Sequence, residues 1–310
     1  MSLTKQRQLE LINTALGYEL LEILKDDDVI EVMLNPDKKL WIDTLSQGRK
    51  DTGLTIEPTS SLRIINLVAN AVETVVNKED PILSAELPET GSRFQGMLPP
   101  TVTNPSFTIR KKAISIFTLE EYMEKETITP KQYTTICSAV KERKNILVVG
   151  GTSTGKTTLC NAIINEMSKY DNRIIILEDT QELQCSAQDV VFMRKTKNTT
   201  MRDLLKSTMR FRPDRIMVGE IRGGEALDLL KAWNSGHPGG ICTIHANDCK
   251  AGLEKLEQYI EEVAASSQQR LIASAVDVVI TIKKDGTRRY VDSIMELRGY
   301  KGEYDLVEVE

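Results

Sequence analysis

One segment of this 310-residue chain restricts the possible folds more than any other. Residues 150–157 read GGTSTGKT, which matches the pattern G-x-x-x-x-G-K-[ST]. An apolar run at 146–149 precedes it and a helical pattern begins at Lys156, so the match lies between an expected strand and an expected helix. Glycines in such a loop let successive backbone N–H groups converge on phosphate oxygens at the start of a helix. The sequence therefore predicts a phosphate-binding loop (P-loop) in an α/β fold.

The side chains of this loop have the chemistry of a nucleotide site. Lys156 places a positive charge near the β and γ phosphates, and Thr157 offers a hydroxyl to Mg²⁺. We expect the rest of the loop to contact the phosphates as well, through Gly150, Gly151, Thr152, Ser153, Thr154, Gly155 and Thr158.

Carboxylates follow two further apolar runs. Glu178 and Asp179 directly follow one run, and Glu220 closely follows another. Because ligands of open α/β sheets bind at the carboxyl ends of the strands, we expect these groups beside the P-loop. Asp179 and Glu220 join Thr157 as candidate Mg²⁺ contacts, mostly through water, and one glutamate would act as general base for the attacking water. Sequence alone leaves open which glutamate that is.

A histidine ends a third apolar run. His245 follows 241–244, where its imidazole could hydrogen-bond the γ-phosphate and report its loss. The residues alone leave this role and an ordinary structural role equally open.

The chain divides into two expected domains. Residues 1–112 are expected to form a small α+β domain, with helices at 4–24 and 60–76 and strands at 29–34, 39–43, 93–97 and 106–110. Residues 131–310 alternate strand and helix patterns, which is typical of a parallel sheet. Residues 113–130 have no clear period and are expected to be the linker.

Composition restricts the possible partners and the compartment. The net charge is −5, without the basic excess of a protein that coats DNA, so we expect no sequence-specific nucleic acid as a partner. No uncharged apolar run approaches the roughly 18 residues of a membrane span. Five cysteines without a C-x-x-C pair favour reduced thiols in a cytosolic protein. Cys242, His245 and Cys249 are too few for a structural zinc site, and the role of the two cysteines stays open.

Four segments occur in a fixed order: the P-loop, ILEDTQEL at 176–183, RPDRIMVGEIR at 212–222 and GGICTIHAN at 239–247. They resemble the Walker A, Asp box, Walker B and His box of the secretion and traffic ATPases of type II and type IV systems. The resemblance is close over 145–250 and weaker in the N-terminal half. The chain lacks the tetracysteine metal module of the type II branch, which favours the type IV and conjugation branch.

The resemblance implies a RecA-like P-loop domain that binds ATP and Mg²⁺ and hydrolyses ATP as the motor of a type IV secretion or conjugative transfer system. It also implies a ring, usually a homohexamer, that is peripheral at the cytoplasmic face of the inner membrane and bound to inner-membrane components. Lys156 and Thr157 would hold phosphate and Mg²⁺, and Glu178 would orient or deprotonate the water. Glu220 would be the Walker B carboxylate, and His245 would contact the γ-phosphate.

Basic residues near the linker are further candidates. Arg93 and Arg110 lie on strand-like segments just before it, where domain closure could bring them onto a bound nucleotide. Arg110 is the main candidate for a contact with the γ-phosphate, where a guanidinium stabilises the charge of the transition state. The alternative is that Arg110 belongs to an exposed basic tail. Eight Lys or Arg residues in the window 194–215 are either a phosphate clamp, a subunit interface or a solvated face.

Two other functions stay open at this point. Residues 77–80 read NKED, the N-K-x-D pattern of guanine recognition, which indicates a GTPase with permuted motif order. That match ends a helical pattern instead of following a strand, and no D-x-x-G accompanies it. The second alternative is a nucleotide-gated assembly factor with little turnover.

Overall fold

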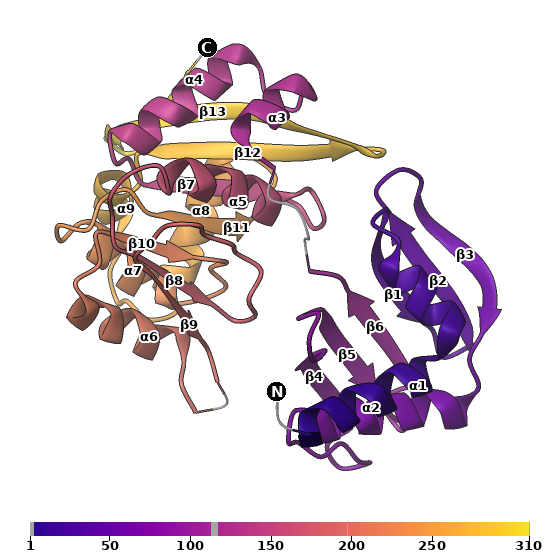
Figure 1. The fold of residues 1–310 in the computed structure, drawn as a ribbon. Helices are drawn as coiled ribbons and strands as arrows, with labels where there is room; N and C mark the ends of the chain where they lie inside the picture. Colours follow the sequence, from indigo (N-terminus) through magenta and orange to yellow (C-terminus); the bar gives the residue numbers. More distant parts are fainter. Residues whose placement is uncertain (1–2, 113–116, 197, 310) are drawn as a thin grey trace. The chain divides into compact units, whose positions relative to one another are not determined.

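The computed structural model describes residues 3–112, 117–196 and 198–309 (Figure 1). The chain forms two compact units, unit 1 at Met1–Ile114 and unit 2 at Ser115–Glu310. Residues 113–116 of the expected linker lie outside the described residues. Each unit has its own sheet, with one hydrophobic core in unit 1 and two in unit 2.

Unit 1 is built on a six-stranded antiparallel sheet in the order β3-β2-β1-β6-β5-β4. The strands are β1 Val29–Leu34, β2 Lys39–Thr44, β3 Gly48–Thr55, β4 Ile82–Glu86, β5 Arg93–Met97 and β6 Ser106–Arg110. Helix α1 (Leu3–Lys25) contacts β1, and α2 (Pro58–Ala71) contacts β4 and β6. The predicted strands of this unit are confirmed. Strands β3 and β4 were not predicted. Strand β3, at one edge of the sheet, reads GRKDTGLT and lacks alternating apolar residues, and β4, at the other edge, has only five residues.

Unit 2 contains an eight-stranded sheet in the order β14-β13-β12-β7-β11-β10-β8-β9. Six neighbouring strands, from β12 to β9 in that order, are parallel, and β13 and β14 add antiparallel at one edge. The strands are β7 Ile146–Gly150, β8 Ile174–Glu178, β9 Val190–Arg194, β10 Arg215–Val218, β11 Ile241–His245, β12 Val278–Asp285, β13 Arg288–Tyr300 and β14 Tyr304–Glu308. The expected parallel sheet is thus correct for its centre, and the antiparallel C-terminal edge was not predicted.

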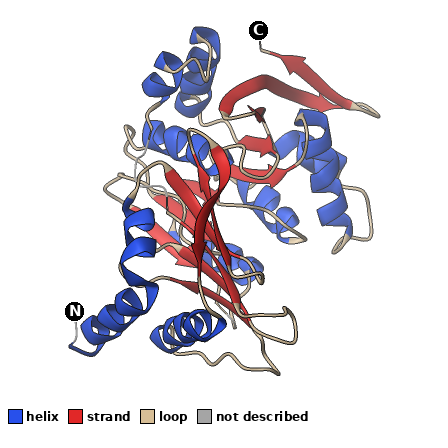
Figure 2. Ribbon diagram, turned by 90° about the vertical axis from the view of Figure 1, so that its right-hand side faces the viewer, coloured by secondary structure: helices blue, strands red, loops and turns tan. Residues whose placement is uncertain are grey.

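Helices cover both faces of this sheet (Figure 1). Figure 2 shows the chain from the side, with helices in blue and strands in red. One core joins the sheet to α6 (Met201–Thr208), α7 (Glu225–Trp233), α8 (Cys249–Glu261) and α9 (Gln269–Ala275). The other joins it to α3 (Leu119–Glu124), α4 (Pro130–Lys141) and α5 (Lys156–Met167). A short 3₁₀ turn, Met209–Phe211, follows α6. The central strands are buried throughout, as expected for a sheet covered on both sides.

Much of the segment expected as a linker belongs to unit 2. Helix α3 begins with a capping box between Thr118 and Glu121, which satisfies two backbone N–H groups at its start. Leu119 and Tyr122 are buried in the core with α5. Six helical residues are too few to give a clear 3.6-residue period, so the sequence pattern did not indicate this helix.

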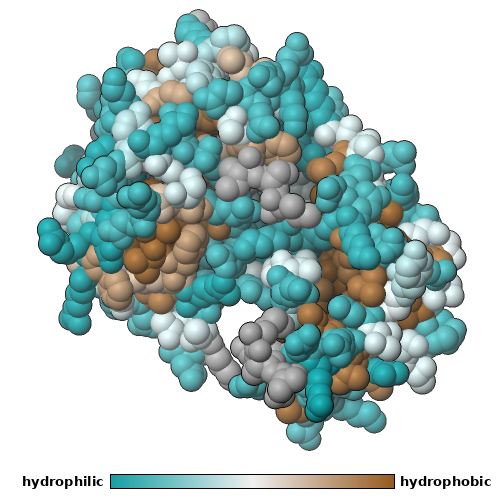
Figure 3. Space-filling model, in the orientation of Figure 1, coloured by the Kyte–Doolittle hydropathy of each residue, from teal (hydrophilic) through white to brown (hydrophobic). Residues whose placement is uncertain are grey.

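Hydrophilic residues dominate the face drawn in Figure 3, and hydrophobic side chains gather in smaller areas between them. Among the helices of the described part of the chain, none is long and apolar enough to span a bilayer.

Candidate active site

The P-loop connects the carboxyl end of β7 to the amino end of α5. Gly155 caps α5 with φ +97°, a left-handed conformation that glycine adopts without strain. A Cβ at Gly150 would lie 2.6 Å from the carbonyl oxygen of Ile282 and 2.7 Å from Thr154 Oγ1, so only glycine fits there. Thr154 Oγ1 donates a hydrogen bond to the Gly151 carbonyl (3.0 Å), which closes the loop on itself. The loop therefore has the compact form that phosphate binding requires.

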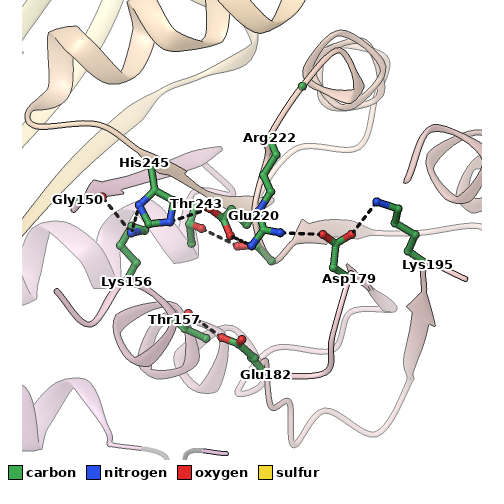
Figure 4. A network of polar contacts seen from close by, with 12 residues as sticks. Gly150, Lys156, Thr157, Asp179, Glu182, Lys195, Glu220, Arg222, Thr243 and His245 are labelled. Atoms are coloured by element: carbon green, nitrogen blue, oxygen red, sulfur yellow. Dashed lines mark hydrogen bonds and ion pairs between the residues drawn. The ribbon is translucent and has the colours of Figure 1, made fainter. Parts of the chain in front are cut away.

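Lys156 begins α5, and its ammonium points back into the loop (Figure 4). Its Nζ donates to the carbonyl oxygens of Gly150 (2.9 Å) and Gly151 (2.7 Å) and to His245 Nδ1 (3.1 Å). The residue is 7% exposed. The side chain is thus held in place at the loop before any phosphate arrives.

His245 bridges the P-loop and the Walker B segment. It ends β11 opposite Gly150 of β7, and its Nε2 lies 2.8 Å from Glu220 Oε1. Because an ammonium only donates hydrogen bonds, Nδ1 must accept from Lys156, and Nε2 carries the proton that is donated to Glu220. This pattern of partners assigns the tautomer.

The Walker B segment around Glu220 is fixed by its backbone. Ile221 N–H donates to the Thr243 carbonyl (3.0 Å), and Thr243 Oγ1 donates to the Gly219 carbonyl (2.7 Å). Strand β11 therefore holds the turn that carries Glu220 beside His245.

The two glutamates of the Asp box have different surroundings. Glu178 ends β8 and is 4% exposed; its Oε1 accepts the backbone N–H groups of Glu182 (3.0 Å) and Leu183 (2.8 Å). Glu182 lies in the loop that follows and is half-buried, and its Oε2 accepts a hydrogen bond from Thr157 Oγ1 (3.3 Å). Glu182, which the sequence analysis did not select, is thus the Asp-box carboxylate in contact with the P-loop threonine.

Helix α5 also anchors this loop. Asn161 lies four residues after Thr157 and is 1% exposed. Its side chain donates to the Glu182 carbonyl (3.3 Å) and accepts from the Gln184 N–H (2.9 Å). These two contacts hold the backbone of Glu182 and Gln184 against α5. The Glu182 side chain then reaches Thr157, which lies one helical turn before Asn161.

Asp179 faces two cations. Its Oδ2 accepts from Arg222 Nη1 (3.1 Å), and its Oδ1 lies 3.7 Å from Lys195 Nζ. Arg222 Nη2 also donates to Glu220 Oε2 (2.6 Å). The hydrogen bond to Glu220 is the main cause that raises the pKa of Arg222. Figure 4 shows Lys156, His245, Glu220, Arg222 and Asp179 following one another across the strand ends.

Arg93 and Arg110 lie in unit 1. They are direct cross-strand partners on β5 and β6, and Glu31 of β1 is the partner of Arg110 on its other side. Burial raises the pKa of Glu31, and the charge of Arg110 partly opposes this shift. Arg110 is exposed at the end of its strand.

The remaining sequence candidates have structural surroundings. The Asn77 side chain accepts the N–H groups of Glu79 (2.8 Å) and Asp80 (2.9 Å) in a turn of unit 1, so the NKED segment forms a local turn. Cys249 Sγ lies 3.0 Å from Thr281 Oγ1, and burial raises the pKa of both Cys242 and Cys249. In the basic window, Arg202 pairs with Asp228.

The sequence analysis did not select Asn161, and it also missed Glu182, Arg222 and Arg289. Glu182 and Arg222 stood inside the quoted motifs, but strand ends drew attention to Glu178 and Glu220 instead. Arg289 of β13 lies over the P-loop, with its Cδ 3.1 Å from the position of a Cβ on Gly155. No pattern in the sequence marks Arg289.

The chain is similar to proteins of secretion and conjugation systems. The family model of type II/IV secretion system proteins matches residues 60–285. The probable conjugal transfer protein TrbB of Sinorhizobium fredii is 44% identical over 97% of this chain and 93% of its own length. The type IV secretion system protein VirB11 of Bartonella quintana is 29% identical over 84% of this chain and 86% of its own.

A solved structure has the same fold. The ATPase DotB of Legionella pneumophila superposes with a TM-score of 0.64 at 17% identity, covering 87% of this chain and 77% of that one. With the family match over most of the chain and the TrbB likeness over nearly all of it, the chain belongs to the type II/IV secretion ATPase family, as its motifs predicted.

Proposed function

We propose that this chain is a motor that hydrolyses ATP to ADP and phosphate and powers type IV secretion or conjugative transfer. The observation that carries the proposal is the joint placement of Lys156, Thr157, Glu182, Glu220 and His245 at one sheet edge in a chain of this family. The relative named as a conjugal transfer protein supports the conjugative branch.

ATP binds with its phosphates at the amino end of α5. Backbone N–H groups of Gly150–Thr158 surround the phosphates, and Lys156 exchanges its contacts with the Gly150 and Gly151 carbonyls for β and γ oxygens. The positive end of the helix dipole favours the same anion.

The oxygen donors beside the P-loop fit Mg²⁺, which prefers hydroxyl, carboxylate and phosphate oxygens. Thr157 would hold it directly, with Glu182, Glu220 and Asp179 mostly through water. Within the described ranges, no three His, Cys, Asp or Glu side chains form a metal cage of their own, which agrees with an ion held largely by phosphates and water. When bound, Mg²⁺ neutralises charge on the β and γ phosphates.

Glu182 orients the attacking water and accepts its proton. It is half-buried and in contact with Thr157, so its carboxylate faces the phosphate position. Glu178 instead holds the backbone of the loop that carries Glu182. The resemblance implied Glu178 for this role, and the sequence left the choice of glutamate open; we propose Glu182 in its place.

Glu220 and His245 respond to the γ-phosphate. His245 donates to Glu220 and accepts from Lys156, so a γ-phosphate that draws Lys156 away frees Nδ1. The histidine therefore couples occupancy of the P-loop to the Walker B carboxylate.

Arg110 and Arg93 supply positive charge to the bound nucleotide from unit 1. Arg93 and Arg110 are direct cross-strand partners on β5 and β6, which brings two guanidinium-bearing side chains to neighbouring positions of that sheet. We assign the γ-phosphate contact to Arg110.

We further propose a RecA-like arrangement of the P-loop unit and a homohexameric ring. The ring would be peripheral at the cytoplasmic face of the inner membrane, bound to inner-membrane components of the machine. Size-exclusion chromatography with light scattering, with and without ATP, tests the ring. A monomer under both conditions would contradict it.

Phosphate release from ATP and from GTP tests the reaction, with Lys156→Ala as the control. Turnover of ATP well above that control supports the proposal. Tight ATP binding without turnover would indicate a nucleotide-gated assembly factor, and preference for GTP would indicate a GTPase.

A further inference from the structure

Arg222 links two carboxylates that come from different strand ends. Its Nη2 donates to Glu220 Oε2 (2.6 Å) and its Nη1 to Asp179 Oδ2 (3.1 Å), so one guanidinium joins the Walker B segment to the Asp box (Figure 4). Lys195 Nζ lies 3.7 Å from the other oxygen of Asp179. Two acidic and two basic side chains thus form a cluster without net charge.

The backbone of Arg222 is anchored while its side chain is open to solvent. Its N–H donates to Glu225 Oε1 (2.8 Å), which also accepts the Gly223 N–H (3.1 Å). The side chain of Arg222 is 52% exposed, against 21% for Glu220 and 32% for Asp179. The guanidinium is therefore free to leave the carboxylates without any change in the backbone around it.

The same carboxylates are the ones that a divalent cation at the P-loop would use, directly or through water. A guanidinium and a divalent cation on one pair of carboxylates repel each other because both are positively charged, and they compete for the same negative charge. Occupation by Arg222 therefore lowers the affinity of these carboxylates for a second cation.

We propose that Arg222 is an internal counterion of Glu220 and Asp179: it competes with Mg²⁺ for these carboxylates, keeps the nucleotide-free site closed to the bare ion, and positions Glu220. This inference rests on the proposed function, since it assigns the cation dependence of that same site. ATP brings its own negative charge to the cluster. When Mg²⁺ arrives together with ATP, the Arg222 guanidinium can therefore leave the carboxylates and pair with the phosphates. Mg²⁺ alone brings no such anion.

A guanidinium suits this role better than an ammonium. Its planar fork spans two acceptors at once, whereas a lysine at this position would act as a point charge on one of them. Arg222→Lys is therefore expected to keep part of the charge effect and lose the positioning of Glu220.

Binding of Mn²⁺, used as a probe for Mg²⁺, is measured by electron paramagnetic resonance on the full chain without nucleotide. We expect Arg222→Ala and Arg222→Gln to bind Mn²⁺ about tenfold more tightly than the unmodified protein, because one positive charge near the ion is lost. The Mn²⁺ affinity of Arg222→Lys should lie between that of the unmodified protein and that of these two variants. Arg202→Ala is the matched control: it also breaks an Arg–Asp pair of 2.6 Å, on α6 and α7, and should bind Mn²⁺ as the unmodified protein does.

ATP turnover of the same variants measures positioning. Loss of Glu220 orientation should lower kcat in Arg222→Lys while the KM for ATP changes less than threefold. A purely structural role would lower the melting temperature without changing Mn²⁺ affinity, and Arg222→Gln decides if Arg222→Ala fails to fold.

Mn²⁺ affinities within twofold of the unmodified protein for both Arg222→Ala and Arg222→Gln would overturn the inference. If the unmodified protein hydrolyses ATP in that case, the proposed function stands without it. If no ATP is hydrolysed but Mn²⁺ binds more tightly to the variants, the counterion role holds and the proposed function fails.

Discussion

Replacing Glu178 by alanine removes the acceptor of two backbone N–H groups inside unit 2, those of Glu182 and Leu183. An unpaired buried N–H costs about 1–3 kcal/mol, so the pair costs about 2–6 kcal/mol. Glu178→Gln keeps an acceptor and loses only the charge assistance, about 1 kcal/mol per hydrogen bond or about 2 kcal/mol in all. For a unit of this size, 1 kcal/mol shifts the melting temperature by about 2–4 °C. Glu178→Gln should therefore lower it by about 4–8 °C, and Glu178→Ala by more.

Glu182→Gln should give the opposite result. The half-buried carboxylate accepts a hydrogen bond from Thr157, and an amide oxygen can still accept it, so the melting temperature should move by less than about 2 °C. The amide cannot take a proton from water, so kcat should fall by about 10²–10⁴-fold. Stability and turnover thus separate the two glutamates.

Thermal melts followed by circular dichroism and steady-state phosphate release, measured on the same preparations, decide between them. Glu261→Gln, an exposed glutamate at the end of α8, is the control and should change neither quantity. The reasoning is refuted if Glu178→Gln loses turnover at an unchanged melting temperature while Glu182→Gln keeps its turnover.

Three further outcomes are expected. Lys156→Ala should abolish hydrolysis and weaken nucleotide binding in calorimetry, because it removes the ammonium aimed at the β and γ phosphates; normal turnover would overturn the site. Arg110→Ala should keep the fold and Mg-ATP affinity but lower turnover about tenfold or more, with little rescue by Arg110→Lys. If kcat and melting of Arg110→Ala both stay unchanged, Arg93 becomes the candidate. Gly240→Ala should lower the melting temperature, since its Cβ would lie 2.2 Å from Trp233 Nε1 and 2.4 Å from the Ile216 carbonyl oxygen; an unchanged melt would contradict that close packing.

The central sheet of unit 2 was predictable because its strands are buried on both faces. Strands β7, β8, β10 and β11 read as short apolar runs, and such runs between helices indicate a parallel sheet. The antiparallel edge gave no comparable signal. Strand β13 reads RRYVDSIMELRGY, with arginines and acidic residues interrupting any regular alternation, because its pairing partners and not its own periodicity fix it as a strand.

The rule that functional groups follow the carboxyl ends of strands found part of the site. It selected His245 and Glu220, which hydrogen-bond each other, because β10 and β11 are neighbours in the sheet. It did not select Arg222, because a basic residue two positions after Glu220 has no special pattern until its partner Asp179, just after the end of β8, is known.

The choice between Glu178 and Glu182 depends on a tertiary contact that spacing does not encode. Glu178 is the last residue of a buried strand, so its carboxylate lies inside the protein and needs hydrogen-bond donors there. The backbone N–H groups of Glu182 and Leu183, in the loop that follows the strand, donate to it. Asn161 also holds that loop against α5, through hydrogen bonds to the Glu182 carbonyl and from the Gln184 N–H. Since Asn161 lies one helical turn after Thr157, the residue delivered over Thr157 is Glu182. The carboxylate that we propose as general base is therefore positioned by an asparagine of the P-loop helix, 21 residues away in sequence.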